Sequence, residues 1–396
     1  MNSLTNPPSH SDILCLSHLR WNFVFQRPQH LMSRFAKDRR VFFWEEPVHD
    51  SAAAQLAVRV CPTTGVHVIE PHLPVISAEQ RTEQLRQMLE MFIESNGIHS
   101  PLLWFYTPMA LEFLPSTLKP STVIYDCMDE LSMFRGAPPE LRVFEQQLLN
   151  MADVVFTGGV SLYEFKRDMH KNIHPFPSGV DVAHFAKARV GQSNFAEHAH
   201  IPRPRLGFAG VIDERMDLDL LAGMARLRPD WHFVMIGPTA KIDPAALPRL
   251  ENIDWLGMKN YSELPMYFAG WDVAIMPFAL NDATRFISPT KTPEFLSAGL
   301  PVVSTPIRDV VRPYGDLGLA KIASTPEEFV EAADQAMMSG MCLKWRERAD
   351  EFLKTLSWDS VWNGMHRLIH DSRSPKIPAA RADSFAELAQ ETSARV

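Results

Sequence analysis

The stretch PTKTPEFLSAGLPVVST, residues 289–305, combines the pattern of a short helix with that of a buried strand directly after it. We predict a helix that opens near Pro289. The apolar run LPVVST, residues 300–305, is typical of a strand inside a sheet. Lys291 and Glu294 stand three positions apart, so their side chains share one face of the predicted helix.

The same alternation of strands and helices extends to both sides of this stretch. From Arg205 onward we predict strands at 205–210, 232–237, 251–257, 272–278 and 300–305, with helices at 216–227, from 262 and near 289. In the first 180 residues we predict strands at 13–17, 40–44, 67–70, 102–106, 122–126 and 153–157, with helices at 27–38, 78–95 and 139–151. Such alternation predicts two α/β domains, each a parallel sheet wrapped by helices.

The chain of 396 residues is too long for one ordinary core, which also favours two domains. We place the first domain at residues 1–185, a linker at 186–204 and the second domain at 205–356. Residues 357–371 form an amphipathic helix that must dock on an apolar surface, and residues 372–396 read as a mobile tail.

Composition excludes several classes of protein. Apolar residues make up 46% and charged residues 22%, as in soluble globular proteins. The formal net charge of -8 argues against nucleic acid as a partner. No stretch supplies the roughly 18 uninterrupted apolar residues of a spanning helix, so we expect a cytoplasmic protein. The four cysteines show no metal-binding or disulfide spacing.

Several motifs resemble retaining glycosyltransferases of the GT-B fold, in the large family four. PTKTPEFLSAGLPVVST resembles their donor-binding helix and strand. PFPSGVDVAHF, residues 175–185, resembles their hinge, and WLGMKNYSELPMYFAGWDVAIMPF, residues 255–278, resembles the strand region before the donor site. WNFVFQRPQHL, residues 21–31, and YDCMDE, residues 125–130, resemble a bacterial subgroup that builds cell-surface polysaccharides, including teichuronic-acid-type enzymes.

This resemblance implies two Rossmann-like domains that face a central cleft. The second domain would hold a nucleoside-diphosphate sugar and the first would hold the acceptor. The helix at 357–371 would cross back to the first domain.

The resemblance also implies roles for donor-site residues. Glu294 would bind the ribose hydroxyls, while Arg215 and Lys291 would neutralise the diphosphate during catalysis. Gly210 lies in the turn after the first strand of the second domain, where backbone can approach a ligand closely. The alternatives are a surface pair of Lys291 with Glu294, and an ion pair of Arg215 with Asp213 or Asp217.

Candidate acceptor-side residues follow strands of the first domain. Asp126, also a catalytic candidate, and Asp129 come at the carboxyl end of a strand, where ligands bind in α/β sheets. A helix with Pro28 in its first turn would carry a basic stripe of Arg27, His30, Arg34 and Lys37. We interpret the preceding aromatic loop and this stripe as an acceptor-facing wall that includes Trp21, Gln26, Arg27 and His30. An ordinary solvated helix face, and a carboxylate that caps a helix, are the alternatives.

Two departures affect the predicted chemistry. Phe286 stands where the family has a first glutamate that contacts sugar hydroxyls, and Tyr125 stands in place of a histidine. Asp282, Thr284 and Ser288 are candidates to replace the missing carboxylate. The Asp217-x-Asp219 pair lies at a predicted helix start, where acidic residues suit the helix dipole, so we predict no metal site.

We therefore predict a metal-independent, retaining glycosyltransferase that uses a UDP-sugar, or alternatively a GDP-sugar, and needs no cofactor. Its acceptor would be a surface polysaccharide or a lipid-linked glycan, with a peripheral contact to the inner face of the cell membrane. A nucleotide-sugar epimerase of the same fold and a non-catalytic nucleotide-sugar-binding subunit are the alternatives.

Overall fold

Strand β1 (Ile13–Leu16) lies in the middle of an eight-stranded sheet that forms the first domain. A computed structural model describes residues 11–190, 197–339 and 343–372. The strand order of the first sheet is β3-β4-β2-β1-β5-β6-β7-β8. Its remaining strands are β2 (Val41–Trp44), β3 (Gln55–Val60), β4 (His67–His72), β5 (Leu102–Phe105), β6 (Thr122–Cys127), β7 (Val154–Thr157) and β8 (Ile173–Pro175).

The six predicted strands of the first domain are confirmed, and two strands, β3 and β8, were missed. Strand β3 pairs antiparallel with β4, whereas the other pairs in this sheet are parallel. Most of its residues are exposed, because it is an edge strand without the buried apolar run that marks its neighbours. The helices of this domain are α1 (Arg27–Phe35), α2 (Ala78–Ser95), α3 (Leu141–Met151) and α4 (Val160–Lys166).

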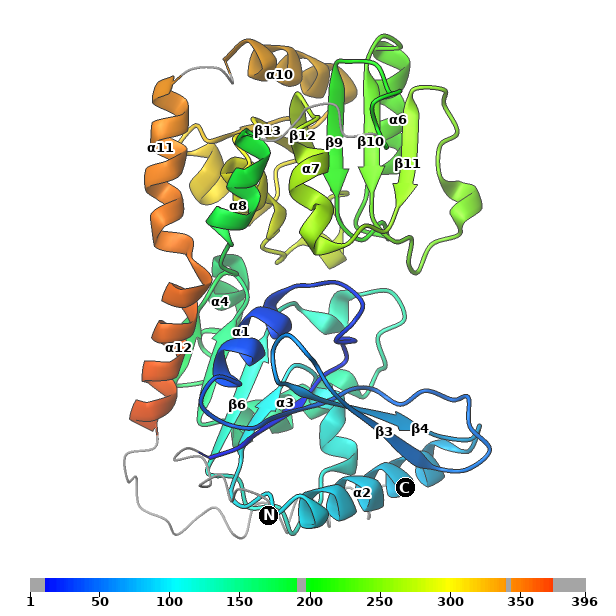
Figure 1. The fold of residues 1–396 in the computed structure, drawn as a ribbon, viewed down its shortest axis with the longest axis vertical. Coiled ribbons are helices and arrows are strands. Elements are labelled where there is room, and N and C mark those ends of the chain that lie inside the picture. The colour runs from blue at the N-terminus through cyan, green and yellow to red at the C-terminus, as the bar shows by residue number, and fades with distance from the viewer. Residues whose placement is uncertain (1–10, 191–196, 340–342, 373–396) are drawn as a thin grey trace, which may run out of the picture.

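A six-stranded parallel sheet with the order β11-β10-β9-β12-β13-β14 forms the second domain, drawn above the first in Figure 1. Its strands are β9 (Arg205–Ala209), β10 (His232–Ile236), β11 (Ile253–Gly257), β12 (Val273–Met276), β13 (Val302–Ser304) and β14 (Ala320–Ile322). Its helices are α6 (Leu218–Leu227), α7 (Leu264–Phe268), α8 (Lys291–Ser297), α9 (Arg308–Val310), α10 (Pro326–Ser339) and α11 (Leu343–Leu353). Apolar clusters cover both faces of each sheet, so the fold is two doubly wound α/β domains.

The chain crosses between the domains twice on the same side. The first crossing precedes α5 (Val182–Phe185), and the second joins α11 to α12 (Trp358–Ser372). The Val180 amide donates to the Leu356 carbonyl at 2.8 Å, so the crossings lie side by side. Helix α12 then packs on the first domain along one edge of the molecule (Figure 1) and buries Trp358, Met365 and Ile369 in its core.

Further contacts join the domains near these crossings. Asp309 of the second domain accepts the backbone N–H groups of Val160 and Ser161, at the start of α4, at 2.9 Å each. Phe286 stacks on Phe165 with 4.5 Å between ring centroids. The predicted linker overlaps residues 191–196, and the predicted tail includes 373–396; both ranges lie outside the described residues. No helix in the described part of the chain is long and apolar enough to cross a membrane.

Candidate active site

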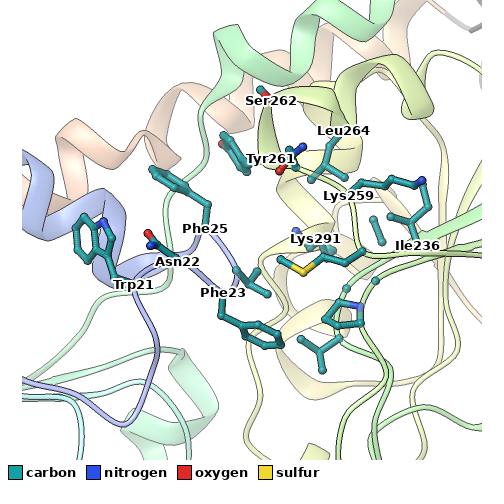
Figure 2. A pocket seen from close by; sticks show the side chains of 18 of the residues that line it. Trp21, Asn22, Phe23, Phe25, Ile236, Lys259, Tyr261, Ser262, Leu264 and Lys291 are labelled. Carbon is teal, nitrogen blue, oxygen red and sulfur yellow. The ribbon is translucent and has the colours of Figure 1, made fainter. Parts of the chain in front are cut away.

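A pocket of about 570 Å³ lies between the two domains (Figure 2). The first domain contributes the loop 21–25 and the turn between β3 and β4. The second domain contributes the loops after β9, β10 and β11, together with Lys291 at the start of α8. Apolar side chains and backbone from both domains therefore surround a cavity with few charged groups, which suits a flat, partly polar ligand.

The aromatic loop 21–25 forms the first-domain wall of this pocket. Trp21 is buried against Phe43, and its backbone N–H donates to Glu45 at 2.7 Å, which holds the loop in place. Phe23 and Phe25 remain exposed and face the second domain, where the Phe25 ring lies 4.9 Å from that of Tyr261. The loop thus reaches across the cleft with aromatic rings instead of cradling a phosphate with glycines.

Gln26 and His30 were predicted to face the acceptor, but both have other roles. Gln26 is the N-cap of α1 and exchanges hydrogen bonds with Gln29, so it serves the helix start. His30 is buried and stacks on Trp358 with ring centroids 4.3 Å apart. Burial lowers the pKa of His30 to about 3, so the ring is neutral and apolar in character. His30 therefore packs against the start of α12, beside the second crossing between the domains.

The predicted basic stripe on α1 is wrong. Arg27 is fully buried and grips Asp126 through Nε at 3.0 Å and Nη2 at 2.8 Å, while Nη1 donates to the Phe176 carbonyl at 2.7 Å. Arg34 pairs with Asp359 at 2.7 Å, and only Lys37 is exposed. The helix turns this face toward β6 and α12, which helical spacing alone could not show.

The prediction that Asp126 is a catalytic or acceptor-side group is also wrong. Its side chain has no exposed surface, and both carboxylate oxygens already accept from Arg27. In this arrangement the carboxylate has no free oxygen for a substrate, and its contacts make it a structural anchor for α1.

Lys291 and Glu294 contact each other as their spacing predicts. The Lys291 ammonium lies 2.6 Å from the Glu294 carboxylate on the first turns of α8. Burial raises the pKa of Glu294, and the Lys291 ammonium opposes that rise. Lys291 lines the pocket, with Glu294 beside it. A cation and a carboxylate are therefore available together at the second-domain wall.

Gly210 lies where the loops after β9 and β10 meet at the pocket. It lines the cavity together with Gly237. A Cβ on Gly237 would lie 1.7 Å from the Gly210 carbonyl oxygen, and Gly237 has a φ of +145°. Side chains are thus excluded at Gly237, and backbone forms this part of the wall.

Arg215 forms the ion pair with Asp213 that was left open as an alternative. Its Nη2 lies 2.7 Å from Asp213, and its guanidinium lies 5.5 Å from the Phe134 ring centroid. Asp129 lies across the cleft from this pair, and its carboxylate has no hydrogen-bond or ion-pair partner among the described residues. Burial raises the pKa of Asp129, while Arg215 lowers it. Of the two predicted acceptor-side carboxylates, Asp126 and Asp129, Asp129 is therefore the one that stays available to a ligand.

Phe286 and its neighbours do not replace the missing family glutamate. Phe286 is buried in the core of the first domain against Phe165. The Thr284 hydroxyl donates to the Ala279 carbonyl at 2.5 Å, and Ser288 hydrogen-bonds Asp309. These side chains join loops and domains. Asp282 is exposed beside them at the start of a short helical turn.

The Asp217-x-Asp219 pair lies at the start of α6, as predicted. Asp217 is the N-cap and accepts the Leu220 N–H at 2.8 Å. This contact explains the first acidic residue without a metal.

Several cleft residues escaped the sequence analysis. Lys259, Asn260 and Tyr261 follow β11 and line the pocket. A position just after the carboxyl end of a strand was the available signal, because ligands bind at that edge of an α/β sheet.

Comparisons with known proteins agree with this architecture. Residues 203–339 match the family model described as glycosyl transferases group 1. A Bacillus subtilis protein provisionally named as the teichuronic acid biosynthesis glycosyltransferase TuaH is 24% identical over 276 residues, which is 66% of this chain and 69% of that protein. Sucrose-phosphate synthase of Thermosynechococcus elongatus superposes with a TM-score of 0.65 at 14% identity, over 91% of this chain and 99% of the other.

Two further structures share the two-domain fold. The catalytic domain of Arabidopsis thaliana starch synthase IV, bound to ADP and acarbose, has a TM-score of 0.65 at 10% identity over 92% of this chain and 99% of its own. The UDP-forming α,α-trehalose-phosphate synthase of Burkholderia vietnamiensis has a TM-score of 0.62 at 14% identity, over 91% and 98%. All of these neighbours place two such domains around one cleft, as in the GT-B fold.

Proposed function

With a glycosyl transferase group 1 domain in its second half, the chain is a nucleotide-sugar glycosyltransferase of the GT-B fold, and we propose that it builds a surface polysaccharide or a lipid-linked glycan. The transfer would retain the configuration of the sugar and need no metal. The observation that supports this best is the pocket between the domains, with the Lys291–Glu294 pair on its second-domain wall.

The donor would lie in this pocket. Its base would enter between the loops after β10 and β11 and the aromatic loop 21–25. Glu294 would accept hydroxyl hydrogens of the ribose, because a carboxylate accepts two such bonds well. Lys291 would lie near the diphosphate. UDP is the first candidate nucleotide, since one structural neighbour is UDP-forming, and GDP stays the alternative.

The proposed reaction is a substitution on one face of the sugar. The bond from the anomeric carbon to the diphosphate oxygen breaks, and the acceptor oxygen bonds to that carbon from the same side. The acceptor proton passes to the departing phosphate. Lys291 and Arg215 would stabilise the negative charge that grows on this phosphate, which is the usual task of fixed cations in such sites. Asp126 takes no part in this scheme.

Two alternatives are still to be tested. An epimerase would consume the nucleotide sugar without an acceptor, and a binding subunit would bind it without consuming it. The replacements Tyr125 and Phe286 motivate the second alternative, since both are buried away from the pocket. The predicted basic stripe on α1 was the surface expected to contact the membrane. Because Arg27 and Arg34 are paired with Asp126 and Asp359, this stripe no longer supports a peripheral membrane contact.

Donor binding is the experiment that tests the proposal. Thermal shifts with UDP, GDP, ADP and their sugars should show one preferred nucleotide, which stabilises the fold by about 2.7 kcal/mol at a hundred times its dissociation constant. Turnover of the preferred donor should continue in EDTA. Lys291→Ala should weaken the shift, whereas Lys344→Ala, an exposed lysine on α11, should not.

No nucleotide shift in the unchanged protein would refute a nucleotide-sugar enzyme. Loss of turnover in EDTA, with recovery on adding manganese or magnesium, would refute the metal-free mechanism. Binding without any donor consumption would support the binding subunit.

A further inference from the structure

Helix α4 lies where the two domains meet (Figure 1), and its start is capped from the other domain. Its N-cap residue, Gly159, has no side chain that could accept the first N–H groups of the helix. The Asp309 carboxylate accepts them instead, Oδ2 from Val160 and Oδ1 from Ser161, both at 2.9 Å. Asp309 is buried, so bulk water does not compete for these N–H groups. The second domain therefore determines where α4 begins.

The rest of α4 also contacts the second domain. Glu164 lies 2.5 Å from Arg308 and 3.1 Å from Arg312, and both arginines are about half exposed. Phe165 stacks on the buried Phe286 with 4.5 Å between ring centroids. Exposed ion pairs contribute little, whereas the stacked rings and the buried cap resist separation. Helix α4 thus belongs to the first domain but is held by the second.

The last residue of α4 holds a loop of the first domain, residues 128–135. The Lys166 side chain is buried, and its ammonium lies 2.5 Å from the Glu130 carboxylate in this loop. The same ammonium lies 2.8 Å from the carboxylate of Glu145 on α3. A buried ammonium cannot move away from these carboxylates without losing its counter-ions, which is costly. A shift of α4 should therefore shift Glu130 as well.

Two adjacent glycines bring the same loop and the second domain against the segment before α4. A Cβ on Gly158 would overlap the Met128 carbonyl oxygen. A Cβ on Gly159 would overlap the Asp309 carboxylate. Only residues without a side chain allow both of these close approaches. The segment before α4 is therefore in contact with the loop and with the second domain at successive residues.

The far end of loop 128–135 contacts the second domain across the cleft. The Arg135 N–H donates to the Glu214 carboxylate at 3.4 Å. The Phe134 ring centroid lies 5.5 Å from the guanidinium of Arg215, the cation proposed to act on the diphosphate. The position of this loop relative to the second domain therefore affects how Arg215 is packed.

We propose that α4 positions loop 128–135 relative to the second domain, with Asp309 and Lys166 as positioning residues for the proposed transfer. Asp309 sets the start of α4, and Lys166 conveys that position to the loop and so to its contact with Arg215. Neither Asp309 nor Lys166 lines the pocket, so neither needs to touch the donor. The role of Arg215 rests on the proposed function, whereas the coupling through α4 can be measured without a substrate.

Amide hydrogen exchange of the full chain, measured by mass spectrometry, tests this coupling. Asp309→Asn keeps the shape but replaces one acceptor oxygen with an amide donor, so one N–H group at the start of α4 loses its partner. Exchange should rise at least about tenfold in residues 158–166, the factor for one charge-assisted hydrogen bond. It should also rise in residues 128–135, with which the Asp309 carboxylate forms no hydrogen bond or ion pair in the described structure, and stay unchanged in α2. Asp316→Asn, which changes an exposed aspartate of the second domain, should leave all of these rates unchanged.

A second pair of variants tests the other end of α4. Lys166→Met should raise exchange in residues 128–135, and Lys166→Arg, which keeps the charge, should restore most of the protection. Asp309→Asn should keep the thermal shift with UDP, because the pocket does not include this residue. Faster exchange confined to residues 158–166, unchanged exchange in both regions, equal effects of the two Lys166 variants, or loss of the UDP shift in Asp309→Asn would overturn the positioning role. Absence of the UDP shift in the unchanged protein would instead overturn the proposed function and leave the coupling measurable.

Discussion

Removing one partner of the Arg27–Asp126 pair should destabilise the first domain strongly. Both side chains are fully buried and share three hydrogen bonds of 2.8–3.0 Å. Asp126→Asn keeps the shape but leaves the Arg27 charge buried without its counter-ion. Such a loss costs about 3–5 kcal/mol. For a domain of this size that corresponds to a fall in melting temperature of roughly 6–20 °C.

The double variant Arg27→Met with Asp126→Leu should recover most of this loss. Apolar residues of similar volume often replace a buried ion pair at little cost. The Phe176 carbonyl would lose its Arg27 donor, which costs about 1 kcal/mol. Together with the single variants Arg27→Met and Asp126→Leu, the double variant closes a double-mutant cycle whose coupling energy should be several kcal/mol.

Urea denaturation followed by circular dichroism measures these changes, and an exposed pair is the matched control. Arg34 and Asp359 lie 2.7 Å apart with Asp359 74% exposed, so Asp359→Asn should cost less than about 1 kcal/mol. Single variants of the buried pair that cost no more than this control would refute the reasoning. Donor turnover should survive in the folded double variant, and its loss there would return Asp126 to the reaction.

Three further predictions concern the cleft and the hinge. Glu294→Gln should weaken donor binding with a small effect on kcat, whereas Lys291→Ala should lower kcat by about 10²–10³ if it stabilises the transition state, and steady-state kinetics with donor titration separates the two. His30 has a folded pKa of about 3 against an ordinary value of 6.5, so its contribution to stability is complete above about pH 6.5 and is lost as the pH falls toward 3. Urea denaturation should show a loss of about 1.4 kcal/mol from this group at pH 5.5, and His30→Phe, which keeps an aromatic ring against Trp358, should flatten that slope. Phe286→Glu should destabilise the protein and leave donor affinity no higher, because the position faces the core of the first domain; tighter donor binding in isothermal titration would contradict this.

Local sequence pattern was sufficient for the frame of the fold and for one contact of the site. Buried strands such as β1 and β6 could be predicted, because each is a short, largely apolar run that is visible in consecutive residues of the sequence. Lys291 and Glu294 meet because the geometry of one helix sets their distance. The edge strand β3 lacks both the burial and the apolar run, so local pattern missed it.

Side-chain contacts between segments far apart in the chain could not be predicted from the sequence. Arg27 and Asp126 are 99 positions apart, and a basic residue on a helix face gives no sign of a carboxylate waiting on another strand. From sequence, Phe286 indicated that a ligand-binding glutamate had been lost. In the structure its side chain stacks on Phe165 of the other domain. Lys241 could not be placed beside Phe134 from sequence, because their contact depends on how the two domains face each other.

The two interdomain crossings are joined by the hydrogen bond from Val180 to Leu356, so they form a hinge at one edge of the molecule. In a rotation about that edge, displacement grows with distance from it. His30 and Trp358 lie at the hinge, and Lys291 acts on His30 from nearby, so the cation at the start of α8 would shift little. The Phe25 ring lies 4.7 Å from that of His30, so this part of the aromatic loop 21–25 would also shift little. A donor bound between Phe25 and Lys291 would therefore keep nearly the same surroundings while the rest of the cleft opens and closes.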